Sequence, residues 1–244
     1  VGAGSAGCAL ANRLSENPDH RVLLVEAGPG DNNFLVHMPK GFGKLLSDPQ
    51  RAWHYQTEPE PATANRAETW VRGKILGGSS ALNGMVYVRG NPGDFDEWAA
   101  AGLKDWDWQN MAPYFRKLEN HGLGGDELRG SDGPVGISIA DCTDPLARAF
   151  IDAGRALGLP ETRDPNRIDQ HGIGPVARNI RNGRRQSSAV AFLQPIKQRA
   201  NLKILTHTRV EKIIIENGKA VGIECRSAGE RLVLRAEKEI ILSA

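Results

Sequence analysis

The first seven residues, "VGAGSAG" (Val1–Gly7), place three glycines at the spacing Gly-x-Gly-x-x-Gly. In a loop of this kind Gly2 allows the tight turn, and Gly4 lets the backbone approach a pyrophosphate. Gly7 lets the following helix pack close to a sheet. The N–H groups at the start of that helix favour a phosphate charge. Because glycine-rich turns are common, the neighbouring sequence must support this interpretation.

The sequence after the loop supports it. Small and apolar residues continue at helical spacing until Ser15, Asn17 and Pro18, which predict the end of a helix. The apolar run "RVLLVEAG" (residues 21–28) then predicts a buried strand that ends at Glu26. A carboxylate about 20 residues after such a loop accepts hydrogen bonds from ribose hydroxyls. The alternative, an ordinary β-α-β unit with a surface glutamate, stays open from these residues alone.

Both ends of the chain lead us to expect a longer natural protein. A strand of about five or six residues should precede the glycine loop, and only Val1 does. At the other end "EKEIILSA" (residues 237–244) reads as an apolar strand that enters a core. We therefore expect that the first strand is missing and that the chain is truncated at both ends.

Composition argues against several classes of protein. Lys and Arg number 31 against 29 for Asp and Glu, a formal charge of +2, whereas a dedicated nucleic-acid binder carries a strong basic excess. The densest basic stretch, Arg178 to Arg185, contains no aromatic residue and is interpreted as a solvated loop. Neither a nucleic-acid partner nor a basic recognition surface is expected.

Cysteine and histidine patterns predict no metal site. The three cysteines lack C-x-x-C spacing and the six histidines form no H-E-x-x-H motif. No apolar run approaches the roughly 18 residues of a membrane span. A reduced, cytoplasmic location is the default expectation.

A second glycine loop points to a larger cofactor than a nicotinamide dinucleotide. Residues 29–70 are rich in Pro, Asn, Asp and Gly, so no second strand-helix-strand unit follows quickly, and a long irregular segment is expected. It leads to Gly77 and Gly78, followed by Ser79 and Ser80, where bare backbone and hydroxyls can meet phosphate oxygens. No Gly-Lys pair is followed by Ser or Thr, so the loop is not a Walker motif. One extended dinucleotide that bridges both loops is the economical explanation, and FAD is long enough.

The remaining segments predict helices and a small sheet. "DWDWQNMAPYFRKLEN" (residues 105–120) predicts a helix whose aromatic face, with Trp108, Tyr114 and Phe115, is expected in the core. "SAVAFLQPIKQRA" (residues 188–200) predicts another helix, broken at Pro195. From residue 202 the period changes to two, and Asn217-Gly218 predicts a type I′ hairpin.

At this point the sequence resembles a known family. "GKILGGSSALNG" (residues 73–84), together with "GAGSAG" (2–7), "LLVEAG" (23–28) and "NPGDFDEWAAAG" (91–102), resembles the glucose-methanol-choline (GMC) flavin oxidoreductases, in their choline-dehydrogenase-like branch. The resemblance covers essentially the whole chain. It implies an α/β fold: a Rossmann-like FAD-binding domain over residues 1–244, with an inserted helical region at about 92–200 and a β-meander at about 202–236. The substrate domain of the family would lie outside this chain.

The resemblance also implies the residues of the cofactor site. The ADP pyrophosphate would be lined by one loop and met by the other, the adenosine ribose would be held by Glu26, and the flavin ring and ribityl chain would be approached by residues 83–86. Leu82 stands where some members tether FAD through a histidine, so non-covalent FAD is expected. The implied residues are Gly2, Gly4, Ser5, Ala6, Glu26, Gly77, Gly78, Ser79, Asn83, Gly84, Met85, Val86 and Val210, the last through its backbone to adenine.

The function implied by the resemblance is oxidation of an alcohol CH–OH group by hydride transfer to the flavin. Two alternatives stay open: a GMC-like lyase that keeps FAD for structure, and a flavin-binding module without chemistry. Asn83 could instead be a helix C-cap, and Met85 and Val86 plain core. We assign no catalytic residue within the chain, because the family's catalytic histidine would follow Ala244. The alcohol and the electron acceptor cannot be read from these residues.

Overall fold

The computed structural model describes all 244 residues, which divide into two compact units. Unit 1 comprises Val1–Gly84 and Ser187–Ala244, and unit 2 comprises Met85–Gln186. The boundaries differ from the expected insertion at about 92–200, because residues 85–91 belong to unit 2 and residues 187–200 to unit 1.

Unit 1 opens with the expected loop and helix at the first glycine motif. Helix α1 (Ser5–Leu14) follows the loop directly and ends at Ser15, whose hydroxyl donates to the Ala11 carbonyl at 2.7 Å. Strand β1 (Val22–Val25) then pairs in parallel with β9 (Leu202–Leu205), far along the sequence. Parallel strands of this kind need a long crossover, which the intervening chain provides.

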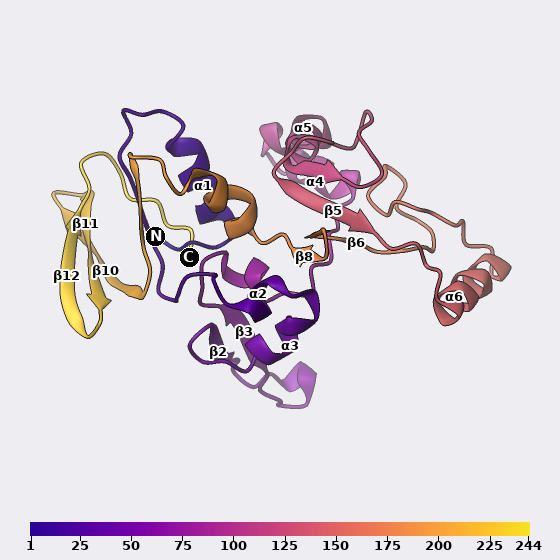
Figure 1. Cartoon of the computed structure of the whole chain (residues 1–244), viewed down its shortest axis with the longest axis horizontal. Coiled ribbons are helices and arrows are strands. Elements are labelled where there is room, and N and C mark those ends of the chain that lie inside the picture. The colour runs from indigo at the N-terminus through magenta and orange to yellow at the C-terminus, as the bar shows by residue number, and fades with distance from the viewer. The chain divides into compact units, whose positions relative to one another are not determined.

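The glycine loop is held on both sides although no regular strand precedes it. The Gly2 N–H donates to the Val25 carbonyl at 2.8 Å. On the other side, the amino group of Val1 donates to the Ile241 carbonyl at 2.7 Å, and the Ser243 N–H donates to the Val1 carbonyl at 2.8 Å. The two ends of the chain therefore lie next to each other (Figure 1), and the C-terminal apolar segment extends the row formed by β9, β1 and the first residues.

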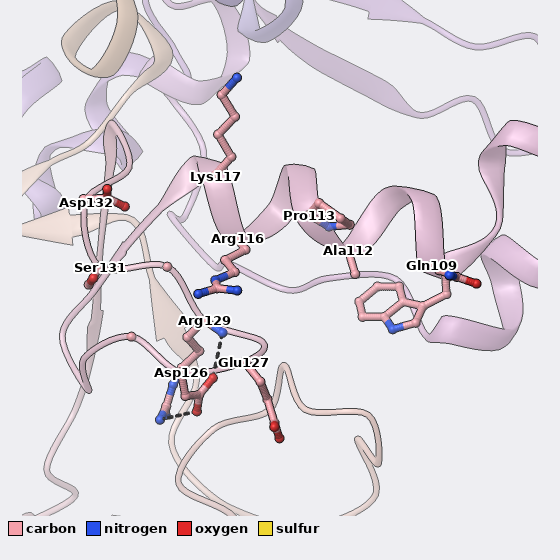
Figure 2. Close-up of a pocket in the computed structure, with 13 residues that line it drawn as sticks. Gln109, Ala112, Pro113, Arg116, Lys117, Asp126, Glu127, Arg129, Ser131 and Asp132 are labelled. Atoms are coloured by element: carbon pink, nitrogen blue, oxygen red, sulfur yellow. Dashed lines mark hydrogen bonds and ion pairs between the residues drawn. The ribbon is translucent and has the colours of Figure 1, made fainter.

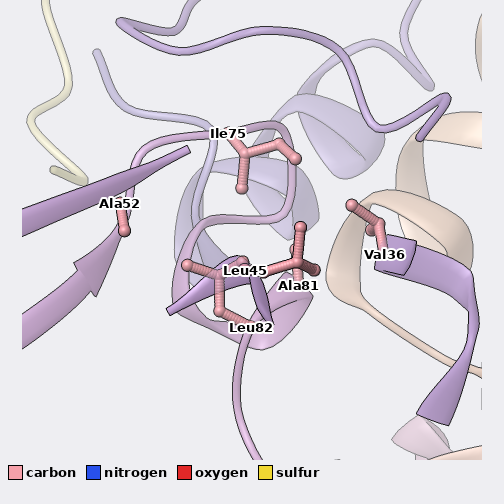
Figure 3. Packing of buried hydrophobic residues seen from close by; sticks show 6 residues of the cluster. All are labelled: Val36, Leu45, Ala52, Ile75, Ala81 and Leu82. Carbon is pink, nitrogen blue, oxygen red and sulfur yellow. The ribbon is translucent and has the colours of Figure 1, made fainter. Parts of the chain in front are cut away.

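The long segment after Glu26 has more regular structure than its composition indicated. It contains the short helices α2 (Phe34–His37) and α3 (Phe42–Leu45), the single turns η1 (Pro39–Gly41) and η2 (Pro61–Thr63), and a hairpin of β2 (Ala52–Gln56) with β3 (Thr69–Gly73). Its buried side chains pack with the residues after the second glycine loop (Figure 3), in a cluster of Val36, Leu45, Ala52, Ile75, Ala81 and Leu82. The segment therefore supports the second loop from the core side.

A three-stranded meander completes unit 1 (Figure 1). It consists of β10 (Thr208–Glu216), β11 (Lys219–Ser227) and β12 (Glu230–Arg235). The turn between β10 and β11 has φ of 50° at Asn217 and 76° at Gly218, as a type I′ turn requires. The meander begins at Thr208 rather than near residue 202, because β9 pairs with β1 instead.

Unit 2 combines three helices with short strands. The helices are α4 (Pro92–Ala100), α5 (Trp108–Leu118) and α6 (Pro145–Ala156), with a turn η4 (Lys104–Trp106). The strands are β4 (Glu119–His121), β5 (Val135–Ile139), β6 (Ala177–Arg178), β7 (Ile180–Arg181) and β8 (Arg184–Arg185). Residues 91–94 form a capping box at the start of α4, in which the Asn91 side chain accepts from the Gly93 N–H at 3.0 Å.

Two predicted helices differ from the structure. On α5, Trp108 and Phe115 are half-buried and contact Phe95, but Tyr114 is 67% exposed, so its placement in the core was wrong. The helix predicted from residue 188 consists of a π-helix, η5 (Ala189–Leu193), and a single turn, η6 (Gln194–Ile196). No helix of the chain is both long enough and apolar enough to cross a membrane.

Candidate cofactor site

The two glycine loops predicted from the sequence lie against each other in unit 1. The Gly77 N–H donates to the Ala3 carbonyl at 2.8 Å. Gly78 has φ of +54°, and a Cβ added to it would stand 2.7 Å from the Gly4 Cα. Only glycine fits at such a contact, so the approach of one loop to the other explains the glycine at position 78. A single extended ligand can therefore reach both loops.

The start of α1 is available to an anion. Gly4 is the extended residue before the helix, no side chain caps the first turn, and that turn holds no acidic residue. Ser5 and Ala6 are exposed, whereas Gly7 packs so closely that a Cβ on it would lie 1.9 Å from the Gly2 carbonyl oxygen. The N–H groups of the first turn have no helical acceptors, and together with the helix dipole they favour phosphate oxygens.

Glu26 stands at the end of β1 with its carboxylate turned toward the first loop. One carboxylate oxygen accepts from the Ala3 N–H at 3.0 Å and the other from the Gly28 N–H at 2.9 Å. Burial raises the pKa of Glu26, while these two N–H groups and the Lys74 ammonium oppose that rise. The residue is thus a buried acid beside the pyrophosphate loop, where the expected ribose contact would be made.

The raised pKa of Glu26 predicts a pH-dependent stability difference. An acid whose pKa is higher in the folded than in the unfolded protein stabilises the fold below its unfolded value, here 4.5, and loses this contribution as pH rises through the folded pKa. We expect the free energy of unfolding of wild type, relative to Glu26→Gln, to fall as the pH rises above the unfolded pKa of 4.5 and through the raised folded pKa. Urea titrations of both proteins measure it. A difference that rises over this range would contradict the assignment.

The second loop is fastened by hydroxyl groups that sequence reasoning did not assign. The Ser80 hydroxyl donates to the Gly77 carbonyl at 2.5 Å, and the Ser188 N–H donates to the Ser80 oxygen at 2.9 Å. The Asn12 amide on α1 donates to the Phe192 carbonyl of η5 at 2.8 Å, which joins this support to the first loop. The adjacent serines were visible in the sequence, but Ser188, which donates to Ser80, lies 108 positions further along.

A cation-aromatic cluster lies beside the Glu26 end of the site. The Lys74 ammonium is 4.4 Å from the centroid of the Trp53 indole, and the Arg209 guanidinium carbon is 5.5 Å from it. The Thr208 N–H donates to the Glu26 carbonyl at 2.9 Å, so the start of β10 runs next to the end of β1. Val210 follows two residues later, opposite Cys225 in the meander. These contacts bring Val210 to the side of the site where the adenosine is expected.

The remaining predicted residues are divided between the units. The Ser79 hydroxyl accepts from the Gly73 N–H at 3.0 Å, which ties it to β3. Asn83 is exposed and a Cβ on Gly84 would meet nothing within 4 Å, so both border open space at the end of unit 1. Met85, buried with φ of +62°, and Val86, 54% exposed, belong to unit 2.

A separate hollow of about 990 Å³ in unit 2 contains none of the predicted residues (Figure 2). It lies between α5 and the loop of residues 125–132. Its basic and acidic side chains are mixed, and Arg129 is held by Asp126 at 2.7 Å. The glycine loops, rather than this hollow, have the chemistry of a dinucleotide site.

Glycine loops, an uncapped helix start and a buried carboxylate after β1 define a dinucleotide-binding α/β protein. The chain belongs to the GMC oxidoreductases, whose family model matches residues 1–244. An oxygen-dependent choline dehydrogenase of Vibrio vulnificus is 46% identical over 246 residues, which cover 100% of this chain and 44% of the relative. The mitochondrial choline dehydrogenase of Mus musculus is 42% identical over 250 residues, covering 100% and 42% respectively.

Solved structures agree with this family. Pyridoxine 4-oxidase from Mesorbium loti has a TM-score of 0.91 at 42% identity, with 97% of this chain and 47% of the other covered. An FAD-dependent oxidoreductase from Chaetomium thermophilum has a TM-score of 0.88 at 28% identity, with 97% and 43% covered. The predicted family, α/β fold and FAD cofactor are confirmed at this level. The chain spans less than half the length of these relatives.

Proposed function

We propose that this chain forms the FAD-binding part of an oxidoreductase that oxidises the CH–OH group of a small alcohol related to choline. The contact between the two glycine loops carries the proposal, since it creates one continuous backbone surface for a pyrophosphate. The identity of 41–46% to several choline dehydrogenases favours an alcohol substrate over the lyase and the non-catalytic module.

The residues of unit 1 would bind and orient the cofactor. The first turn of α1 would hold the phosphates from one side and Gly77–Gly78 from the other, while Glu26 would accept the ribose hydroxyls. Bound FAD would supply the acceptor for the hydride of the alcohol. Glu26 is the one acidic side chain among these residues, and its two oxygens already accept from the Ala3 and Gly28 N–H groups, so we assign no catalytic residue here.

Attachment of FAD without a covalent bond rests on Leu82. This residue is 2% exposed and packs in the cluster with Val36 and Leu45, so its side chain is part of the core. A reactive imidazole at this position is absent, and no nucleophile replaces it. The electron acceptor stays unassigned. A cytoplasmic location is also a proposal, supported by three free cysteines.

The identity of the released flavin tests the proposal. We expect the native protein to purify yellow and to release FAD, not FMN, on denaturation. Because the loops and Glu26 serve the adenylate half, FMN would lack most of these contacts. Chromatography of the supernatant identifies the released cofactor. Turnover of choline and a panel of other alcohols with an artificial electron acceptor measures the oxidation. Flavin that stays on the denatured chain would contradict the Leu82 argument, and NAD alone in the supernatant would contradict the cofactor.

A further inference from the structure

A buried charged cluster in unit 2 holds the segment that follows Gly84. The Glu119 carboxylate accepts from the Tyr87 hydroxyl at 2.7 Å and from Arg89 Nε at 2.8 Å through the same oxygen, and Arg89 Nη2 also bonds to it. The other oxygen accepts from the Gly130 N–H at 3.2 Å. The side chains of Arg89 and Glu119 are each 1% exposed. The Arg89–Glu119 pair is therefore fully buried.

The backbone of the same segment is fixed at alternate residues. The Tyr87 N–H donates to the Ala177 carbonyl at 2.8 Å. The Asn166 amide bridges the segment, accepting from the Arg89 N–H at 2.7 Å and donating to the Tyr87 carbonyl at 3.2 Å. Residues 85–89 consequently alternate: Met85, Tyr87 and Arg89 are buried, whereas Val86 and Val88 are 54% and 60% exposed.

Because of this alternation, residues 85–89 have two possible orientations, and in each of them a different set of side chains is buried. A slip by one residue in an extended segment exchanges its two faces. Such a slip would carry the valines inward and leave Glu119 without Arg89, a buried charge without a partner. Buried ion pairs are poor sources of stability, and register is the best attested use of them. Glu119 therefore specifies which side of residues 85–89 faces outward.

We propose that Glu119 is a positioning residue of the flavin site, acting through Tyr87 and Arg89 on Met85 and Val86. This inference rests on the proposed function, in which Met85 and Val86 approach the flavin. Arg89 Nη1 has no hydrogen-bond partner, so loss of the carboxylate charge would leave the guanidinium with the Leu128 carbonyl, the Phe115 ring and weakened hydrogen bonds to residue 119. In Glu119→Gln a single neutral amide oxygen would replace the charged oxygen that Tyr87 and Arg89 share, and the amide NH2 group could not accept from the Gly130 N–H. Both changes act on the orientation of residues 85–89, while the contacts of the glycine loops are left intact.

The test compares Glu119→Gln and Tyr87→Phe with wild type in the native holoprotein. Three quantities are measured on folded, FAD-loaded enzyme: flavin content, the flavin absorption spectrum, and kcat and KM for choline. We expect Glu119→Gln to keep its FAD, to shift the flavin bands and to lower kcat about ten- to hundredfold, as a misplacement of about 1 Å near reacting groups does. Tyr87→Phe removes one hydrogen bond at constant volume and should shift the spectrum in the same direction, with a fall in kcat of a few fold.

Glu161→Gln is the matched control. Glu161 is an acid of unit 2 that pairs with Arg148 at 3.3 Å, but both side chains reach solvent, and the substitution should leave spectrum and kcat unchanged. An unchanged spectrum and kcat in Glu119→Gln would overturn the proposal, as would a loss of activity explained by loss of FAD. Should Glu119→Gln fail to fold, Tyr87→Phe decides in the same way. The FAD content and the rate of alcohol oxidation of the wild-type protein test the proposed function, and this test does not depend on the results for the variants.

Discussion

Gly78→Val is expected to abolish retention of FAD. Valine would place a Cβ 2.7 Å from the Gly4 Cα, where no side chain can stand without moving the backbone. The φ of +54° adds strain, since a β-branched residue in the left-handed region costs about 1–2 kcal/mol. The two loops would be forced apart at the contact that forms the pyrophosphate surface. Flavin content of the purified native protein, measured from absorbance, should fall by at least about tenfold, which corresponds to about 1.4 kcal/mol of binding free energy.

Gly229→Val separates the strain from the contact. Gly229 lies in the turn between β11 and β12 with φ of +88°, and nothing lies within 4 Å of an added Cβ. This variant has comparable backbone strain, but its new side chain contacts neither glycine loop, so the protein should keep its flavin. Cys142→Ala, at a position without a motif, serves as a second reference. Equal flavin occupancy in Gly78→Val and Gly229→Val would remove the second loop from the site.

Arg89→Met should cost about 3–5 kcal/mol of the free energy of unfolding, the usual penalty for removing one partner of a buried ion pair. Burial disfavours the charge of Arg89, but Glu119 beside it more than compensates and raises the pKa of the guanidinium. Without that cation the buried carboxylate keeps only Tyr87 and the Gly130 N–H as partners. Urea denaturation followed by circular dichroism measures the change, which exceeds a third of the stability of many domains.

Two comparisons make this prediction specific. Arg21→Met removes the Arg21–Glu237 pair, whose side chains are 79% and 83% exposed, and exposed pairs contribute about 0–1 kcal/mol. The double variant Arg89→Met with Glu119→Gln removes the unpaired charge and should be more stable than Arg89→Met alone. A loss below about 1 kcal/mol in Arg89→Met would show that the cluster does not behave as a buried pair.

The features of the fold that could be predicted from the sequence are mostly local ones, such as loops and turns. The first glycine loop, the strand that ends next to Glu26 and the turn at Asn217-Gly218 each depend on a few consecutive residues. In the structure they have the expected conformations, because turn geometry is decided within a single turn of chain. Such features are readable without knowledge of what packs against them.

Long-range partners could not be predicted from the same patterns. Nothing in the sequence shows that Ser188 meets Ser80, or that Arg209 lies over Trp53. The period of α5 marks an aromatic face but not which part of it is covered, so Tyr114 was placed in the core although it is exposed. The strand β9 has the same two-residue period as the meander, and only its pairing with β1 separates them. The role of each flavin-site residue stays a prediction.

The pairing of Val1 with Ile241 and Ser243 has a consequence for the order of folding. Residues 1–7 are synthesised long before Ile241, which lies 240 positions after Val1, and β1 long before its partner β9 (Val22 pairs with Leu202). Contacts between residues so far apart in the sequence form late, because closing the long loop between them costs chain entropy before the contact can stabilise the fold. The meander and the hairpin of β2 and β3 can form from local pairing while the ribosome is still adding residues. We therefore expect the first glycine loop to be among the last parts of unit 1 to become rigid, so that capture of the cofactor would mark the end of its folding rather than the start.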